Sequence, residues 1–164
     1  MIEIVVGQNE KRVVKILHDS QKKEERVITL AGEGAEVEVE EVFISSSDSS
    51  IRIVHSAPRT KSLIKTRGVV DKSQLATANA CVVIPKSSYL CESFVSQRFL
   101  LLDETSRAQV TPSLEIEAND VSASHETAIA PLDEQAIFYA ETRGLSRSDA
   151  KKLLIDAFLG GGSK

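Results

Sequence analysis

The sequence predicts a mainly β fold that ends in two short α-helices. Apolar and polar residues alternate strictly in short segments, turn-forming residues separate these segments, and the alternation stops after Pro131. A period of two places alternate side chains on opposite faces of a strand. Many short strands, with 4% aromatic residues and no tryptophan, are typical of a β-sandwich or a β-solenoid. No repeat of fixed length distinguishes these two architectures.

Strands are expected where the alternation is clear. These segments are residues 3–6, 12–18, 26–30, 36–40, 51–54, 63–66, 80–84, 99–102 and 114–117, followed by a strand that contains His125. Turn-rich sequence separates them at residues 32–34, 45–50, Pro58, 71–73 and 119–120. The mixed charges at residues 22–26 indicate a solvated turn.

Two helices are predicted after Pro131. Asp133 is a suitable N-cap for the first helix, and Gly144 lies where a left-handed C-terminal cap is expected. Ser146 begins the second helix, with Asp149 three residues later as in a capping box. The apolar stripe of the second helix is expected to be Ala150, Leu153, Leu154, Ala157 and Phe158. The glycine-rich residues 160–164 are expected to form a flexible tail.

The composition excludes several classes of protein. A chain of 164 residues with 41% hydrophobic and 27% charged residues is typical of one soluble domain. Its net charge of −4 provides no basic face for nucleic acid. No apolar run approaches the roughly 20 residues that span a bilayer, and acidic Glu3 argues against a signal peptide. Cys81 and Cys91 lack a CxxC spacing, which favours reduced cysteines in a cytoplasmic protein.

The last third of the chain carries the most specific motifs. Residues 114–158 contain LEI-x-A-x-DV-x-x-SH, LDE-x-x-x-FY-x-x-x-RGLS and A-x-x-LLI-x-AF. The segment IVHSAPRTKS, residues 53–62, also fits a His-x-x-Pro-x-Thr-x-Ser pattern. On these residues the chain resembles the SufB/SufD family, the scaffold proteins of the SUF iron–sulfur cluster assembly machinery.

The resemblance implies a right-handed parallel β-helix (β-solenoid) core over residues 1–130 and a helical segment over residues 131–159. In the family the helices dock SufC, an ABC-type ATPase, and the matching positions are Phe138, Tyr139, Arg143, Gly144 and Leu145. Family subunits meet through their cores, which implies a homodimer or a pair with a SufB/SufD paralogue. Family members also carry an additional N-terminal region, so the chain is expected to be a compact relative or a fragment.

His125 is the main candidate for chemistry. Alternation places it on the same face as Val121 and Ala123, so one interpretation is an ordinary packing residue. The resemblance implies a second interpretation, because SufB-type members carry a His-Glu pair here that acts with a cysteine at the subunit interface. On that basis His125, Glu126 and Asp120 are candidates for cluster assembly and dimer contact. Adjacent strand residues point apart, so His125 and Glu126 could bind one ion only where the strand ends or bends.

The cysteines argue against a permanently bound cluster. The SufB cysteine would align near Gln97, and Cys81 and Cys91 are expected to be small buried apolar residues. A stable iron–sulfur cluster normally requires several thiolates. The expectation is therefore no stably bound cofactor, with an iron–sulfur cluster bound only transiently and His125 as the candidate ligand.

The favoured function is a non-catalytic scaffold that docks SufC and couples its ATP cycle to cluster assembly or transfer. The chain has no GxxxxGK[ST] motif, so it is not itself that ATPase. One alternative is a β-solenoid enzyme that acts on carbohydrate through carboxylates such as Glu36, Glu38 and Glu40. Another is a purely structural adaptor without cluster chemistry.

Overall fold

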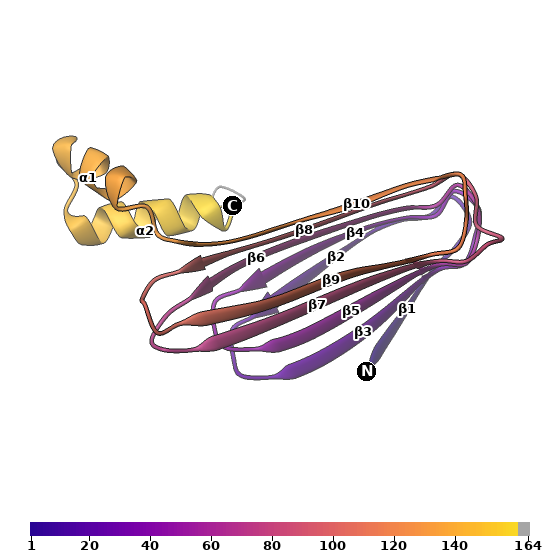
Figure 1. The fold of residues 1–164 in the computed structure, drawn as a ribbon, viewed down its shortest axis with the longest axis horizontal. Helices are drawn as coiled ribbons and strands as arrows, with labels where there is room; N and C mark the ends of the chain where they lie inside the picture. Colours follow the sequence, from indigo (N-terminus) through magenta and orange to yellow (C-terminus); the bar gives the residue numbers. More distant parts are fainter. Residues whose placement is uncertain (161–164) are drawn as a thin grey trace.

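The computed structural model describes residues 1–160, and over this range the chain forms ten β-strands and two α-helices (Figure 1). The strands are β1 (Ile2–Val6), β2 (Lys11–His18), β3 (Lys23–Leu30), β4 (Glu36–Phe43), β5 (Asp48–His55), β6 (Lys61–Val70), β7 (Leu75–Ile84), β8 (Cys91–Leu101), β9 (Arg107–Ile116) and β10 (Val121–Pro131). The helices are α1 (Glu134–Thr142) and α2 (Arg147–Phe158). Every predicted strand and both predicted helices are present.

The strands form two parallel sheets, and the chain visits them alternately. One sheet has the order β1-β3-β5-β7-β9, and the other has the order β10-β8-β6-β4-β2. We call them sheet A and sheet B. Each turn of the chain therefore adds one strand to each sheet, which makes the core a parallel β-solenoid. This confirms the architecture that the family resemblance implies and excludes the sandwich.

The length of a coil changes along the solenoid. Glu41 and Thr66 face each other from neighbouring coils and are 25 residues apart, whereas Ser62 and Ser93 are 31 residues apart. A strict sequence repeat requires a constant coil length. The varying length therefore explains why no repeat is visible in the sequence.

One corner of the solenoid is built from stacked residues with left-handed backbone. Each donates its backbone N–H to a carbonyl of the next coil: Asn9 to Glu33 (3.0 Å), Gly34 to Pro58 (3.4 Å), Arg59 to Tyr89 (3.0 Å) and Leu90 to Asp120 (2.6 Å). The φ angles of the four donors lie between 54° and 71°. This conformation is sterically costly for residues other than glycine, so the hydrogen bonds between coils help to hold it.

The interior is filled by inward-facing aliphatic residues, as the alternation predicts. Phe43 and Phe99 also face inward, and their ring centroids lie 5.3 Å apart. Gly68 occupies the position between them in the register of sheet B. A Cβ atom there would lie 2.1 Å from the Phe99 ring, so this row of the core requires glycine.

The outward face of sheet B carries ion pairs between neighbouring coils. Lys11 pairs with Glu36 at 3.4 Å, Lys15 with Glu40 at 3.0 Å and Lys65 with Glu38 at 2.7 Å. The three carboxylates lie on β4, an inner strand of sheet B, and each pairs with a lysine of a neighbouring strand. This arrangement gives no support to a pair of catalytic carboxylates for a glycosidase.

Two expectations about turns were wrong. The charged run at residues 22–26 is mostly strand, since β3 begins at Lys23, and its Arg26 and Glu24 side chains are only partly exposed and pair at 2.6 Å. The expected turn at residues 45–50 ends early because β5 begins at Asp48. In both places polar residues point into the solenoid, a placement that hydrophobicity alone does not predict. Ser47 and Ser49 are hydrogen-bonded there, whereas Arg26 Nη1 has no hydrogen-bond partner among residues 1–160.

The two helices form a hairpin with its own small core. Asp133 and Ser146 cap the helices through bonds to the backbone of Gln135 and Asp149, and Gly144 is left-handed with a φ of 93°, as predicted. The hairpin core consists of Ile137, Ala140 and Ala150, with Leu132 and Leu154 packed against it. The predicted stripe of α2 is wrong at Leu153 and Ala157, which are exposed. They are exposed because α2 packs mainly on α1 rather than on the strands.

No helix within residues 1–160 is long and apolar enough to cross a membrane. Of the tail predicted at residues 160–164, residues 161–164 lie outside the part of the chain that the structure describes.

Candidate functional site

His125 lies on β10, in the last coil of the solenoid. We call this C-terminal end of the strand stack, formed by β9 and β10, the open end. His125 is aligned with Val95 of β8, which is fully buried, so it occupies an inward-facing row. Over residues 1–160, β10 is the last strand of sheet B and β9 is the last strand of sheet A. The His125 side chain belongs to the inward-facing row, but no further strand of the described chain covers it, so His125 is exposed. Ile116 and Ile129, on the same two strands, are 40% and 44% exposed.

Glu126 lies on the opposite face of β10 from His125. Its Oε1 accepts hydrogen bonds from Ser96 at 2.7 Å and from Arg98 Nη2 at 2.8 Å, both on β8. The Ser96 hydroxyl and the Arg98 guanidinium lower the pKa of this exposed carboxyl. Because β10 continues unbroken from Val121 to Pro131, His125 and Glu126 do not converge on one point.

Asp120 lies in the exposed turn before β10. Its backbone carbonyl accepts the last of the stacked corner bonds, from Leu90 at 2.6 Å. Asp120 therefore lies at the same end of the molecule as His125, but no hydrogen bond or ion pair connects the two side chains within residues 1–160. Within residues 1–160, no three His, Cys, Asp or Glu side chains are grouped closely enough to hold a metal ion.

The two cysteines lie in different environments, and neither forms a disulfide. Cys91 is fully buried in the main core, as predicted. Cys81 was expected to be a buried apolar residue, and this is wrong. It is half-buried on the outer face of sheet A, with Arg52 Nη1 at 3.3 Å and Glu115 Oε1 at 3.5 Å from its sulfur. The core at this level is already filled by Val82, the inward-facing residue that follows it.

Gln97, near which the family resemblance aligns a SufB-type cysteine, is buried inside the solenoid. Its Nε2 donates to the carbonyl of Ala78 at 3.3 Å, and its Oε1 has no hydrogen-bond partner among residues 1–160. The position is occupied by a structural amide and offers no thiolate.

The helical hairpin carries large exposed side chains. Phe138 is 67% exposed, Tyr139 60%, Leu153 54% and Leu145 37%. We call these four residues the exposed hairpin residues. Arg143 lies over the Tyr139 ring, with its Cζ 5.2 Å from the ring centroid, and its Nη2 donates to the tyrosine hydroxyl at 3.0 Å. This cation–π contact and the hydrogen bond favour one orientation of the Tyr139 ring on the surface.

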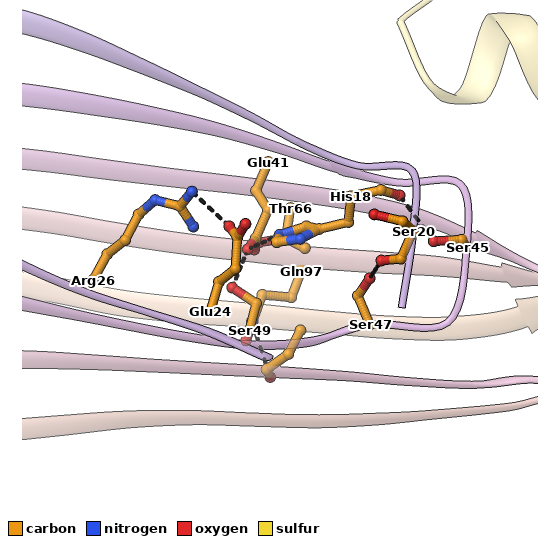
Figure 2. A network of polar contacts seen from close by, with 11 residues as sticks. His18, Ser20, Glu24, Arg26, Glu41, Ser45, Ser47, Ser49, Thr66 and Gln97 are labelled. Carbon is orange, nitrogen blue, oxygen red and sulfur yellow. Dashed lines mark hydrogen bonds and ion pairs between the residues drawn. The ribbon is translucent and has the colours of Figure 1, made fainter. Parts of the chain in front are cut away.

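Sequence reasoning missed a polar cluster in the interior, which Figure 2 shows. Glu41 is 2% exposed and accepts hydrogen bonds from the hydroxyls of Ser49 and Thr66, and its Oε1 lies 2.9 Å from His18 Nε2. The signal was present in the sequence, because Glu41 stands in the same alternating phase as the buried Val37 and Val39.

A second buried polar cluster surrounds His55. Its Nδ1 lies 2.7 Å from Thr60 Oγ1, and its Nε2 lies 2.9 Å from Ser62 Oγ. Thr60 Oγ1 in turn lies 3.2 Å from Cys91 Sγ. Burial lowers the pKa of His55 to about 4, so the ring is neutral at pH 7. The His-x-x-Pro-x-Thr-x-Ser pattern therefore ties a turn of the solenoid together.

Comparison with known proteins agrees with the geometry. The family model "SUF system FeS cluster assembly, SufBD core domain" matches residues 12–158. An iron–sulfur cluster assembly SufBD family protein of Synechocystis sp. is 34% identical over 117 residues, which cover 71% of this chain and 25% of that protein. The Bacillus subtilis iron–sulfur cluster assembly proteins SufD and SufB are each 24% identical, over 88% and 80% of this chain and 34% and 26% of their own lengths. The chain thus spans about a quarter to a third of these relatives.

Proposed function

Because the chain belongs to the SufB/SufD family of SUF iron–sulfur cluster assembly proteins, we propose that it is a non-catalytic scaffold subunit that docks a SufC-type ABC ATPase. The ATPase binds the helical hairpin, and its ATP cycle is coupled through the hairpin to cluster assembly or transfer. In this role the protein works in the cytoplasm, with the cluster as cargo rather than as a resident cofactor.

The observation that carries the proposal is the exposure of Phe138 and Tyr139 on a hairpin that has its own core. Ile137 and Ala140 face the second helix and are buried, so α1 does not need its aromatic residues for packing. Phe, Tyr and Arg residues are enriched in protein interfaces. In Figure 1 α1 lies beyond the strand ends, while α2 runs back toward the strands.

The open end of the solenoid is the proposed site of pairing with a second copy or with a SufB/SufD paralogue. The outer edges of β9 and β10 present unpaired backbone groups beside partly exposed apolar residues. In a two-fold dimer both His125 side chains would stand near the symmetry axis. There His125 serves as a transient ligand for iron, while Glu126 remains paired with Arg98.

Coupling requires two states of the scaffold that the bound ATPase favours differently. Closure of two ATPase subunits on ATP would pull on two hairpins and change the contacts at the open end. The alternative of a purely structural adaptor shares the docking step and lacks the cluster step.

The first test is co-expression with a tagged SufC-type ATPase, followed by purification and measurement of stoichiometry. The proposal predicts a stable complex with one ATPase for each copy of this chain. Failure to recover a complex at micromolar concentrations would contradict it. A His125→Ala variant separates the two scaffold roles, because an adaptor keeps its function and a scaffold with cluster chemistry loses cluster transfer.

A further inference from the structure

Two contacts between the helical hairpin and the solenoid bear on how the hairpin is held, and beside the first of them Glu134 and Lys151 line a cleft with residues 101–104. The first is the covalent connection at Leu132 and Asp133, where the Leu132 N–H donates to the carbonyl of Leu101 at 3.2 Å. The second is the C-terminal end of α2, which Figure 1 shows running back toward the strands. There Leu159 and Gly160 line a cleft of about 200 Å³ with Val42 and Arg67 of sheet B.

The second contact brings a cation to a helix C-terminus. The last turn of α2 contains no basic residue of its own. The Ile155 and Ala157 carbonyls accept from the N–H groups of Leu159 and Gly160, and the aligned peptide groups leave partial negative charge at this end of the helix. Arg67 approaches from β6, and a Cβ atom on Gly160 would lie 2.7 Å from its Nη1. Gly160 is left-handed, with a φ of 91°, so glycine here both ends the helix and leaves room for the guanidinium.

The other charged residues at this cleft are already paired. Glu40 binds Lys15 at 3.0 Å, and Lys65 binds Glu38 at 2.7 Å. Glu41 faces the interior, where His18, Ser49 and Thr66 satisfy it. Arg67 is thus the charge at this cleft that is positioned to interact with the end of α2.

Among residues 1–160, no buried apolar cluster spans this contact. The buried residues of the hairpin form a cluster separate from the two core clusters of the solenoid. The orientation of the hairpin therefore depends on the short connection, with the cleft beside it, and on a surface contact to which Arg67 contributes charge and Val42 and Leu159 contribute apolar surface. Such a contact can open without unfolding either part.

We infer that Arg67 and the C-terminal end of α2 form a releasable latch. With the latch closed, α2 is held against the outer face of sheet B. With the latch open, the hairpin swings about Leu132 and Asp133 and carries the exposed hairpin residues with it. The regulatory meaning of the latch rests on the proposed docking of an ATPase on this hairpin, because a partner that binds one orientation better shifts the latch equilibrium. The latch itself is a property of the isolated chain.

Hydrogen exchange of the isolated chain tests the latch. Arg67→Ala should accelerate amide exchange in the last turn of α2 by about two- to fivefold at low salt, the range expected for a lost charge–helix contact. Arg67→Lys should preserve most of the protection. Lys61→Ala is the matched control, since Lys61 lies on the same strand and pairs with Glu92 at 3.1 Å, away from α2. Unchanged exchange at β6 shows that the variant is folded.

A distance measurement tests the swing. Spin labels at Lys11→Cys and Lys152→Cys, in a Cys81→Ser background, should give one narrow distance distribution in the parent protein. The distribution should broaden with Arg67→Ala and in 1 M NaCl, which screens the contact. Equal exchange rates and equal widths in the parent and Arg67→Ala would overturn the latch. ATPase binding by the parent chain is measured separately, so loss of the latch and loss of the proposed function give different results.

Discussion

His18 Nε2 lies 2.9 Å from Glu41 Oε1 inside the solenoid, where the two side chains are 1% and 2% exposed. The contact joins β2 to β4, so it links the first coil to the second. Glu41 also accepts from Ser49 and Thr66, which brings a third coil into the same cluster. A charged residue at a core position is tolerated only when such partners replace its water.

Replacing Glu41 should destabilise the fold more than replacing its exposed neighbour. Glu41→Gln keeps the shape of the side chain but weakens its hydrogen bonds with Ser49, Thr66 and His18, and we expect the free energy of unfolding to fall by about 1–3 kcal/mol. Glu40→Gln removes only a surface pair with Lys15 and should cost less than about 1 kcal/mol. Urea unfolding measures the free energy of unfolding of both variants. Equal losses would show that the buried cluster stabilises the fold no more than the surface pair does.

Acid should weaken the fold through His55. Its pKa is lowered from 6.5 to about 4, so between these values the unfolded chain binds a proton that the folded chain refuses. The contribution of neutral His55 to the free energy of unfolding is present above pH 6.5 and is lost as the pH falls toward 4. Between pH 7 and pH 5 the loss should be about 2 kcal/mol. Urea unfolding at the two pH values measures this loss.

His55→Gln should flatten this dependence, whereas His125→Ala, at an exposed site, should leave it intact. A His55→Gln protein that loses as much stability on acidification as the parent would rule out His55 as the source.

Gly68 should tolerate no side chain while Phe99 is present. Gly68→Ala places a methyl group within the Phe99 ring position, and the required shift should cost about 1–3 kcal/mol in a thermal or urea unfolding experiment. Phe99→Leu in the same chain should recover part of that loss relative to the two single changes. Gly7→Ala, whose new atom would lie 3.4 Å from Glu10, is the control with a small effect. Strict additivity of the Gly68 and Phe99 changes would contradict the steric argument.

The open end should mediate self-association or pairing with a paralogue. If the partner is a second copy, sedimentation at tens of micromolar should detect a dimer. Ile129→Lys on the exposed inward row of β10 should shift it toward monomer. Val13→Lys, on a residue 49% exposed at the opposite end of sheet B, should leave the dimer unchanged. A persistent monomer that also fails to bind a SufB/SufD paralogue would contradict an interface at this end.

Much of the fold was predictable because each β-strand leaves a local pattern of alternating residues in the sequence. Strict alternation located β4 and β5, and the capping residues Asp133 and Ser146 located the helices. The choice of a solenoid over a sandwich was not predictable from the pattern, because both bury one face of each strand. Coils of 25 and 31 residues removed the repeat that would have decided it.

The candidate site was predictable only in part. Alternation correctly placed His125 on the inward-facing row, but its exposure depends on β10 being the last strand of sheet B in the described chain, which is a tertiary fact. The exposure of Phe138 and Tyr139 likewise depends on how the helices pack. Glu41 could have been found from its phase in β4, whereas its partner His18 comes from another coil and required the register between strands.

The most direct test of the account is binding of a SufC-type ATPase to the Phe138→Asp, Tyr139→Asp double variant. If the hairpin is the docking site, removal of two central aromatic anchors should weaken binding at least about 30-fold in a titration, while the thermal unfolding of the solenoid is unchanged. Tyr89→Asp, an exposed aromatic on the solenoid, should bind as the parent does. Undiminished binding by the double variant would contradict the assignment of the hairpin as the docking surface.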